Sequence, residues 1–182
     1  MNTNKTQILI FIGIPASGKT SFYNCFYKND YKHINLDTLK TRYQENLAMN
    51  EYLKNNENIV IDNTNITKEE RKKYIFTGKE NNYKIIGYYF KSSIRECIER
   101  NEKRKNKIPR TAVANKFNNL ELPSFDEGFD ELYYVSIENS EFKIECWNDN
   151  LTEVIKWKQK IQDLMNLDKE WKFMRHTLLL QN

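Results

Sequence analysis

The residues best suited to chemistry lie near the amino end of the chain, where Gly13 to Thr20 read G-I-P-A-S-G-K-T. Glycines here let the main chain curl so that successive N–H groups point at a phosphate chain. Lys19 brings a mobile positive charge to the outer phosphates, and Thr20 offers a hydroxyl to Mg²⁺. The segment is a complete P-loop and predicts binding of ATP with Mg²⁺. The expected ATP ligands are Gly13, Pro15, Ala16, Ser17, Gly18, Lys19, Thr20 and Ser21.

The segments on either side of the P-loop have the patterns that its function requires. Gln7 to Ile12 is short, apolar and β-branched, as expected of a central parallel strand. Phe22, Cys25 and Phe26 recur at helical spacing just after Lys19. A strand, a glycine-containing loop and a helix in this order favour a phosphate site over a simple turn.

A P-loop alone does not separate hydrolases, switches and kinases, so the residue opposite the γ-phosphate decides between them. Asp37 follows a short predicted strand, Lys32 to Asn35, whose carboxyl end opens into the binding crevice. A carboxylate there can accept the proton of an acceptor hydroxyl during phosphoryl transfer. The alternative is that Asp37 caps a helix that begins near Thr38.

The next predicted strand, Asn58 to Asp62, leads directly into a run of polar side chains. Asp62 lies where an acid can hold Mg²⁺ or its waters, while Thr64 and Asn65 can donate hydrogen bonds to a phosphate or sugar. A helix that begins near Thr67 can aim its amino end at the same crevice. Because Asp-Asn-Thr-Asn is also favourable turn chemistry, a purely structural role for these residues remains an alternative.

A basic segment follows in the second half of the chain. Seven basic and three acidic residues lie between Arg95 and Arg110, whereas the remainder of a chain with net charge +4 is balanced. A stretch rich in Arg, Lys and Asn between two helical patterns has the composition of a closing lid, expected over residues 100–110. An arginine in such a lid can neutralise the charge of a phosphoryl transition state. The alternative is a solvated helix face.

Alternating strand and helix patterns over residues 1–148 predict one α/β domain, with a central parallel sheet covered by helices. Thr67 with Glu70, and Ser93 with Glu96, have the capping-box spacing of helix starts, and Pro109 suits the first turn of another helix. The expected strands are Gln7–Ile12, Lys32–Asn35, Asn58–Asp62, Lys84–Phe90 and Tyr133–Ile137, with a possible edge strand at Phe142–Trp147.

Residues 149–182 have a different pattern, an amphipathic helical spacing interrupted near Asp168 and Arg175. We expect a C-terminal helical extension of the same domain that packs on the sheet, with a partner-binding helix as the alternative. The 182 residues are enough for a core without disulfides, and three widely spaced cysteines indicate neither a zinc site nor a disulfide framework. No apolar run reaches the roughly 20 residues of a membrane span, so we expect a soluble, cytoplasmic protein.

These residues together resemble the 5′-polynucleotide kinases, which phosphorylate 5′-hydroxyl ends of DNA or RNA. The likeness covers roughly the first 145 residues, and five motifs occur in the same order at similar spacings. They are G-I-P-A-S-G-K-T at 13–20, H-I-N-L-D-T-L at 33–39, D-N-T-N at 62–65 followed by Arg71, R-N-E-K-R at 100–104, and F-N-N-L-E-L-P-S-F-D-E-G-F at 117–129. The last motif resembles a segment of bifunctional end-healing enzymes.

The resemblance implies a three-layer P-loop kinase-like fold and a role for each matched residue. Lys19 and Thr20 would serve ATP and Mg²⁺, and Asp37 would be the general base. Lys40 stands where the family can carry an arginine that engages the acceptor's phosphate. The acceptor would be bound by Asp37, Lys40, Asp62, Thr64 and Asn65, and the lid arginines that contact ATP would be Arg100 and Arg104.

The chain also departs from the family's pattern before the expected base. Position 36 is Leu where the family often has arginine, and Lys40 is a less exacting phosphate ligand than arginine. The expected function is transfer of the γ-phosphate of ATP to a nucleic-acid 5′ end, in strand repair. The alternatives are a small-molecule kinase for a nucleoside, sugar or antibiotic, and an ATP-dependent regulatory module that transfers nothing. The sequence does not indicate an oligomeric state.

Overall fold

The structure, a computed structural model, describes residues 5–148 and residue 155. The chain divides into two compact units, Met1–Cys146 and Trp147–Asn182. The expected C-terminal helical extension lies, apart from residue 155, outside the described residues. Along the part of the chain that is described, no helix is both long enough and apolar enough to cross a membrane. The first unit carries the sheet and every motif named above.

A six-stranded sheet forms the centre of the first unit, in the order β2-β3-β1-β4-β5-β6. Every neighbouring pair is parallel except β5 and β6, which run antiparallel. The expected α/β fold with a parallel sheet is confirmed, and so is the edge strand. The strands are β1 (Gln7–Ile12), β2 (Lys32–Ile34), β3 (Ile59–Ile61), β4 (Lys84–Phe90), β5 (Glu131–Glu138) and β6 (Glu141–Cys146).

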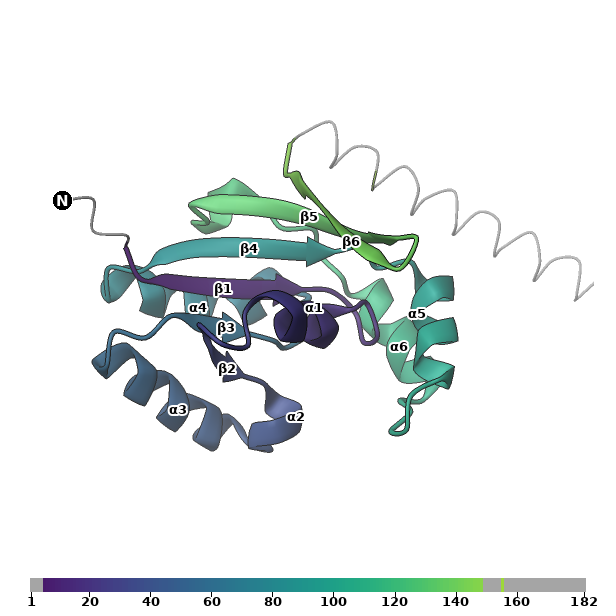
Figure 1. Cartoon of the computed structure of the whole chain (residues 1–182), viewed down its shortest axis with the longest axis horizontal. Coiled ribbons are helices and arrows are strands. Elements are labelled where there is room, and N and C mark those ends of the chain that lie inside the picture. The colour runs from purple at the N-terminus through teal and green to yellow at the C-terminus, as the bar shows by residue number, and fades with distance from the viewer. Residues whose placement is uncertain (1–4, 149–154, 156–182) are drawn as a thin grey trace, which may run out of the picture. The chain divides into compact units, whose positions relative to one another are not determined.

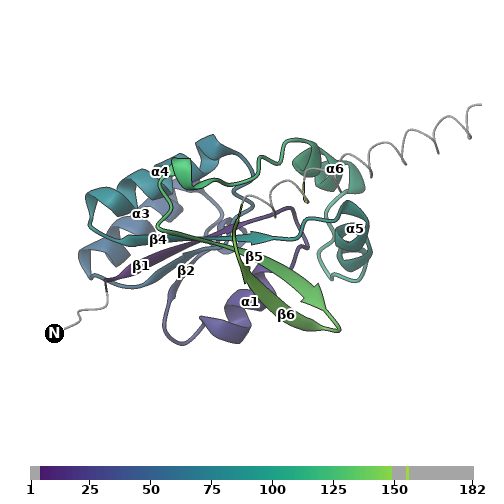
Figure 2. The same cartoon turned by 90° about the horizontal axis from the view of Figure 1, so that it is seen from above.

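Helices cover both faces of this sheet, as a three-layer fold requires. Figures 1 and 2 show α3 and α4 on one face, α1 on the other, and α5 with α6 at the end towards which β1 and β4 point. The helices are α1 (Lys19–Phe26), α2 (Leu36–Leu39), α3 (Arg42–Lys54), α4 (Lys68–Glu80), α5 (Ile94–Glu102) and α6 (Arg110–Asn118), with a 3₁₀ turn, η1, at Phe125–Glu127.

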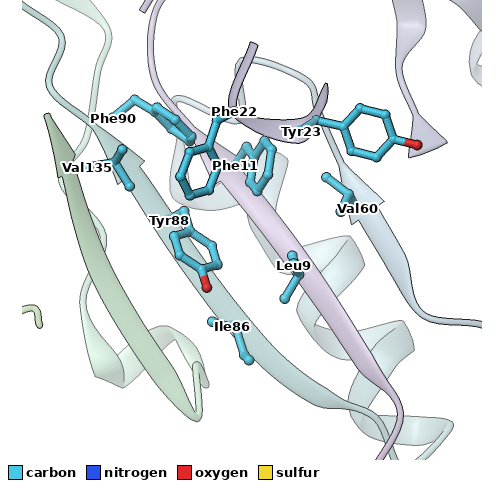
Figure 3. Packing of buried hydrophobic residues seen from close by; sticks show 9 residues of the cluster. All are labelled: Leu9, Phe11, Phe22, Tyr23, Val60, Ile86, Tyr88, Phe90 and Val135. Carbon is cyan, nitrogen blue, oxygen red and sulfur yellow. The ribbon is translucent and has the colours of Figure 1, made fainter. Parts of the chain in front are cut away.

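An aromatic cluster fixes α1 against the sheet. Phe22 of α1 is fully buried and meets Phe11 of β1 and Phe90 of β4, with ring centroids 5.6 and 5.2 Å apart in edge-to-face geometry (Figure 3). Phe142 of β6 lies 5.1 Å from the same ring. Since edge-to-face pairs add to the stabilisation from burial, this cluster gives the helix after the P-loop a rigid base.

The two expected capping boxes have different outcomes. Thr67 accepts a hydrogen bond from the Glu70 N–H, and the Glu70 carboxylate reaches back to the Thr67 N–H, so the box at α4 is confirmed. At α5 the helix start is confirmed, with Ser93 as the N-cap residue, but Ser93 makes no side-chain cap hydrogen bond. Glu96 instead pairs with Lys91 across 2.7 Å, an ion pair that the spacing pattern does not reveal.

A buried ion pair joins two of the sequence motifs named above. Arg71 is fully buried, and its guanidinium meets both carboxylate oxygens of Glu127, at 2.6 and 2.8 Å. The remaining guanidinium nitrogen donates to the carbonyls of Asn65, Ile66 and Glu121 at 3.0–3.1 Å. Arg71 therefore ties the loop after β3 to η1 and to the segment before it.

Candidate active site

A half-open cavity of about 500 Å³ is lined by the residues that follow β1, β2 and β3. In an open parallel sheet this edge is where ligands bind. The cavity brings together Lys19, Thr20, Asp37, Asp62, Thr64, Asn65, Arg100 and Arg104, as well as Pro15, Ala16, Gly18 and Ser21. Gly13, Ser17 and Lys40, also expected in the site, do not line it.

The P-loop has the bent main chain that its sequence predicts. Ala16 has φ 63° and Gly18 has φ 109°, both in the left-handed region. A Cβ atom at Gly18 would lie 2.9 Å from Cδ1 of Ile137, and the left-handed conformation is what requires glycine there. Gly18 is the N-cap of α1, whose first N–H groups have no partners within the helix and are suited to phosphate oxygens.

The Lys19 side chain folds back over its own loop. Its ammonium donates to the carbonyls of Gly13 and Ile14, both at 2.9 Å, and lies 3.4 Å from the Ser17 hydroxyl. Burial lowers the pKa of Lys19 to about 8, against the attraction of the Asp62 carboxylate, which favours the charged form. An anion bound beside this group would favour its charged form further and raise its pKa again.

Asp62 joins three segments at the end of β3. Its Oδ2 atom accepts hydrogen bonds from the Thr20 hydroxyl at 2.7 Å and the Asn35 amide at 3.1 Å, and lies 3.0 Å from His33 Nε2. The His33 ring itself stacks on Tyr23 of α1, 3.8 Å between centroids. One carboxylate thus fixes the P-loop threonine, β2 and the residue before α2.

The second oxygen of Asp62 has no hydrogen-bond partner among the described residues, although it is buried. A buried carboxylate oxygen without a partner is costly, which indicates a ligand. The neighbouring donor set, a threonine hydroxyl and a carboxylate, consists of the hard oxygen atoms that Mg²⁺ prefers. The residues present therefore fit the Mg²⁺ ion that the P-loop predicts.

Asp37 lies on α2 and is exposed, with its side chain lining the cavity. The helix is capped by Asn35, whose Oδ1 accepts from the Asp37 N–H at 2.9 Å, so the alternative in which Asp37 is the cap is wrong. Within the described part of the chain its carboxylate has no hydrogen bond or ion pair. Lys40, by contrast, donates to the Asp37 carbonyl and is not among the residues that line the cavity.

The loop after β3 combines structural and exposed groups. Asn65 is buried with φ 46°, and its amide donates to the Phe11 carbonyl at 2.7 Å. The Thr64 carbonyl accepts from the Gly13 N–H at 2.9 Å, while its side chain lines the cavity. Both residues hold the loop against β1. Their roles as acceptor ligands remain predictions.

The two lid arginines have different environments. Arg100 of α5 donates from Nε to the Ala16 carbonyl at 2.8 Å and so supports the P-loop directly. Arg104 follows α5, is exposed, and lines the cavity without a side-chain partner among the described residues. The buried Asn101 pairs with both the N–H and the carbonyl of Ile108, at 3.0 and 2.7 Å, and closes the loop that carries Arg104.

Several functional residues were missed at the sequence level. Arg42 and Lys116 line the cavity as further cations, and Glu70 lines it as an anion. Asn63 and the buried Glu45 form a hydrogen-bonded network beside α2. The motif letters H-I-N and D-N contain His33, Asn35 and Asn63, but only the fold shows their partners. Arg42 and Lys116 belong to helices far apart in sequence, and no local pattern joins them.

Comparison with known proteins agrees with this geometry. A family model described as an AAA domain matches residues 8–123, well over half of the chain. The chain belongs to the AAA domain family. AAA-domain membership agrees with the P-loop, with the parallel sheet and with the phosphate-ready helix start described above, and it makes the chain a nucleotide-binding protein of the P-loop kinase type.

Three relatives of this AAA-domain chain are kinases. The bifunctional polynucleotide phosphatase/kinase of Schizosaccharomyces pombe is 28% identical over 151 residues, 78% of this chain and 36% of that protein. A putative enzyme of the same name from Acanthamoeba polyphaga mimivirus is 31% identical over 145 residues, 72% of this chain and 34% of that protein. The L-seryl-tRNA(Sec) kinase of Methanococcus maripaludis is 24% identical over 169 residues, which are 82% of this chain and 65% of that protein. The chain thus spans about a third of the two bifunctional enzymes.

Solved structures share the fold. The Pnkp1/Rnl/Hen1 RNA repair complex matches with a TM-score of 0.55 and 23% identity, over 65% of this chain and 45% of that one. Chaetomium thermophilum Kti12 in complex with ADP-AlF₃ matches with a TM-score of 0.60 and 16% identity, over 86% and 97%. A gluconokinase from Sinorhizobium meliloti matches with a TM-score of 0.53 and 16% identity, over 74% and 84%. At these identities the likeness establishes the fold alone.

Proposed function

We propose that this AAA-domain protein is an ATP-dependent kinase that transfers the γ-phosphate to the 5′-hydroxyl end of DNA or RNA during strand repair. The observation that carries the proposal is the carboxylate of Asp37, which has no partner among the described residues and lines the same cavity as Lys19 and Thr20. A carboxylate free to accept a proton beside a phosphate-binding loop is what hydroxyl phosphorylation needs.

The charge of the cavity supports a nucleic-acid acceptor over a small one. Five cationic side chains line it, and no aromatic side chain does so among the described residues. Pockets for small neutral molecules are mostly apolar and aromatic, whereas a strand end brings phosphates to the site. The cations are Lys19, Arg42, Arg100, Arg104 and Lys116. The two relatives that are bifunctional polynucleotide phosphatase/kinases point the same way.

Each residue has a stated role in the proposed reaction. The P-loop N–H groups and Lys19 bind the phosphates of ATP, and Asp37 accepts the proton of the acceptor hydroxyl as its oxygen bonds to the γ-phosphorus. The bond from the γ-phosphorus to the β–γ bridging oxygen breaks in the same step, and ADP leaves. Arg104 approaches the phosphates from the lid and offsets the charge that spreads over the transferred group. Thr20 and Asp62 would hold Mg²⁺, which when bound neutralises charge on the β- and γ-phosphates.

The same proposal includes the protein's setting. ATP is abundant in the cytoplasm, and the three cysteines are free thiols, which a reducing compartment maintains. We therefore place the reaction in the cytoplasm. Detection of the native protein in a cytosolic fraction by immunoblotting is the expected result, and its recovery only in an oxidising compartment would contradict this placement.

A panel of acceptors tests the substrate class. Purified protein is incubated with γ-labelled ATP, Mg²⁺ and one acceptor at a time: 5′-hydroxyl DNA and RNA oligonucleotides, nucleosides, gluconate and a seryl-tRNA. The expected result is label on the 5′ ends of oligonucleotides and none on the small acceptors. The 5′-phosphorylated oligonucleotide is the matched control, because it offers the same strand without the reacting hydroxyl. Label on nucleosides or sugars alone would overturn the proposal.

A further inference from the structure

The helix that carries Asp37 depends on side chains outside itself. α2 has only four residues, too few to be stable alone. Its first two N–H groups are held by asparagine side chains from two different segments. Asn35 Oδ1 accepts from the Asp37 N–H, and Asn63 Oδ1 accepts from the Leu36 N–H, both at 2.9 Å. The location of the Asp37 carboxylate is therefore set from the ends of β2 and β3.

Asn63 is itself held by a buried acid. Its amide nitrogen donates to Glu45 Oε1 at 2.7 Å and to the Tyr74 hydroxyl at 3.1 Å. Glu45 lies on α3, is fully buried, and also accepts from the Tyr74 hydroxyl at 2.5 Å. The amide oxygen of Asn63 thus accepts a hydrogen bond from α2, and its amide nitrogen donates hydrogen bonds to α3 and α4. Such an amide can adopt only one orientation, since the reverse would place its donors against the Leu36 N–H.

Two cations complete the environment of Glu45. Arg42 Nη1 lies 2.7 Å from its Oε2, and Lys73 Nζ lies 3.1 Å from the same oxygen. Burial by itself would raise the pKa of Glu45, but the hydrogen bonds from Tyr74, Arg42 and Lys73 outweigh it and lower that pKa. The acid therefore stays charged near neutral pH and keeps its acceptor role towards Asn63. Arg42 also lines the cavity, so the network joins two of its walls.

We propose that Asn63, oriented by Glu45, is a positioning residue that fixes the start of α2 and thereby holds the Asp37 carboxylate where the acceptor hydroxyl must bind. The inference rests on the proposed function, because it assigns Asp37 the role of proton acceptor. Asn63 does not touch the reacting atoms. It acts through the Leu36 N–H, one residue before Asp37, and a misplacement of about 1 Å at that point can cost about 100-fold in rate.

The amide of Asn63 and the carboxylate of Glu45 can be exchanged between the two positions by substitution. Asn63→Asp keeps an oxygen for the Leu36 N–H but sets a carboxylate against Glu45. We expect a loss of kcat of about 10- to 100-fold, with little change in ATP affinity. Glu45→Gln added to this variant supplies an amide donor opposite the new carboxylate, and we expect it to recover about tenfold. The double variant failing to exceed Asn63→Asp would overturn the proposal.

A second cycle separates positioning from general damage to the fold. Asn63→Ala should lower kcat in the wild-type background and leave the residual turnover of Asp37→Ala unchanged, because the residue then has nothing to position. If Asn63→Ala lowered turnover in the Asp37→Ala background by the same factor as in the wild-type background, the inference would be overturned. Asn24 is an exposed residue of α1. Asn24→Asp is the matched control for added charge and should retain wild-type turnover. Thermal unfolding and ATP binding of every variant verify the fold.

The outcomes for the inference and for the proposed function are distinct. Oligonucleotide turnover that survives Asp37→Ala would contradict the proposed function and the inference with it. Turnover that is lost in Asp37→Ala but unchanged in both Asn63→Asp and Asn63→Ala would overturn the positioning role alone. Loss in all three variants, with recovery in the exchanged pair, is the result that supports both.

Discussion

The Thr20 hydroxyl donates to Asp62 Oδ2 over 2.7 Å, and this contact links the P-loop to the end of the neighbouring strand β3. β1 and β3 pair in parallel, with Ile10 opposite Ile61, so the residues that follow each strand emerge side by side. The other oxygen of Asp62 is buried without a partner among the described residues. Thr20 and Asp62 therefore form one unit, and their oxygen atoms are of the kind that Mg²⁺ prefers.

Replacing Thr20 tests the metal assignment. Thr20→Ala removes the hydroxyl that is expected to contact Mg²⁺, so the Mg²⁺ concentration for half-maximal turnover should rise by about tenfold or more. Thr20→Ser keeps the hydroxyl and is the matched control, expected to behave as wild type. Titration of turnover with Mg²⁺ at saturating ATP gives both values. The assignment is contradicted if Thr20→Ala shows the wild-type Mg²⁺ dependence.

The two lid arginines should respond differently to replacement. Arg104 has no side-chain partner among the described residues, so Arg104→Ala should fold normally and lower kcat by about 10³-fold if it offsets transition-state charge. Arg100 supports the Ala16 carbonyl, so Arg100→Ala should weaken ATP binding as well. Single-turnover kinetics and equilibrium ATP binding separate the two effects. Equal losses of ATP affinity in both variants would refute this division of roles.

The buried pair between Arg71 and Glu127 should contribute strongly to the stability of the fold. Arg71→Ala leaves a buried carboxylate unpaired, and we expect a loss of about 3–5 kcal/mol in the free energy of unfolding. The exposed pair of Arg95 and Glu99 is the control, because Arg95→Ala should cost about 0.5 kcal/mol. Urea denaturation measures both. A loss in Arg71→Ala no larger than in Arg95→Ala would show that the motif has another purpose.

Glu45 gives a pH dependence with a definite sign. Its pKa is lowered in the folded protein, so the folded state binds fewer protons than the unfolded chain in acid. The stability that Glu45 contributes is fully present above the ordinary glutamate pKa of about 4.3 and is lost as the pH falls below it. Unfolding free energies of wild type and Glu45→Gln should differ most at neutral pH and converge in acid. A difference that grows on acidification would contradict the ion-pair network.

Local patterns were sufficient for much of the fold. β1 and β4 match their expected bounds, because uninterrupted apolar runs between polar turns leave little freedom at either end. β2 ends one residue early, and β3 is one residue shorter than expected at each end. Beyond Ile34 and Ile61 a side chain joins the two segments, because the Asn35 amide donates to the Asp62 carbonyl. The Thr67 box was predictable because it is local. Ser93 does begin α5 as predicted, but its capping box does not form, and Glu96 pairs with Lys91 and Arg100 instead.

Site residues that belong to local sequence motifs could be predicted from the sequence. Residues that only tertiary contacts bring to the site could not. The P-loop, Asp37, Asp62 and Arg104 were identified from motifs and were found around one cavity. Glu45 and Arg42 were not identified, because an acid and a base on an apparently ordinary helix are typical of a solvent-exposed face. Only the packing of α3 against α4 reveals that Glu45 is buried and paired with Lys73 and Tyr74.

The central claim is that Asp37 accepts the proton of a strand's 5′ hydroxyl while the P-loop holds ATP. Turnover of a 5′-hydroxyl oligonucleotide by Asp37→Asn, compared with wild type at equal protein and saturating ATP, tests it most directly. The account predicts a fall in kcat of about 10²- to 10⁴-fold, with ATP affinity and thermal stability unchanged. Wild-type turnover in Asp37→Asn would contradict it.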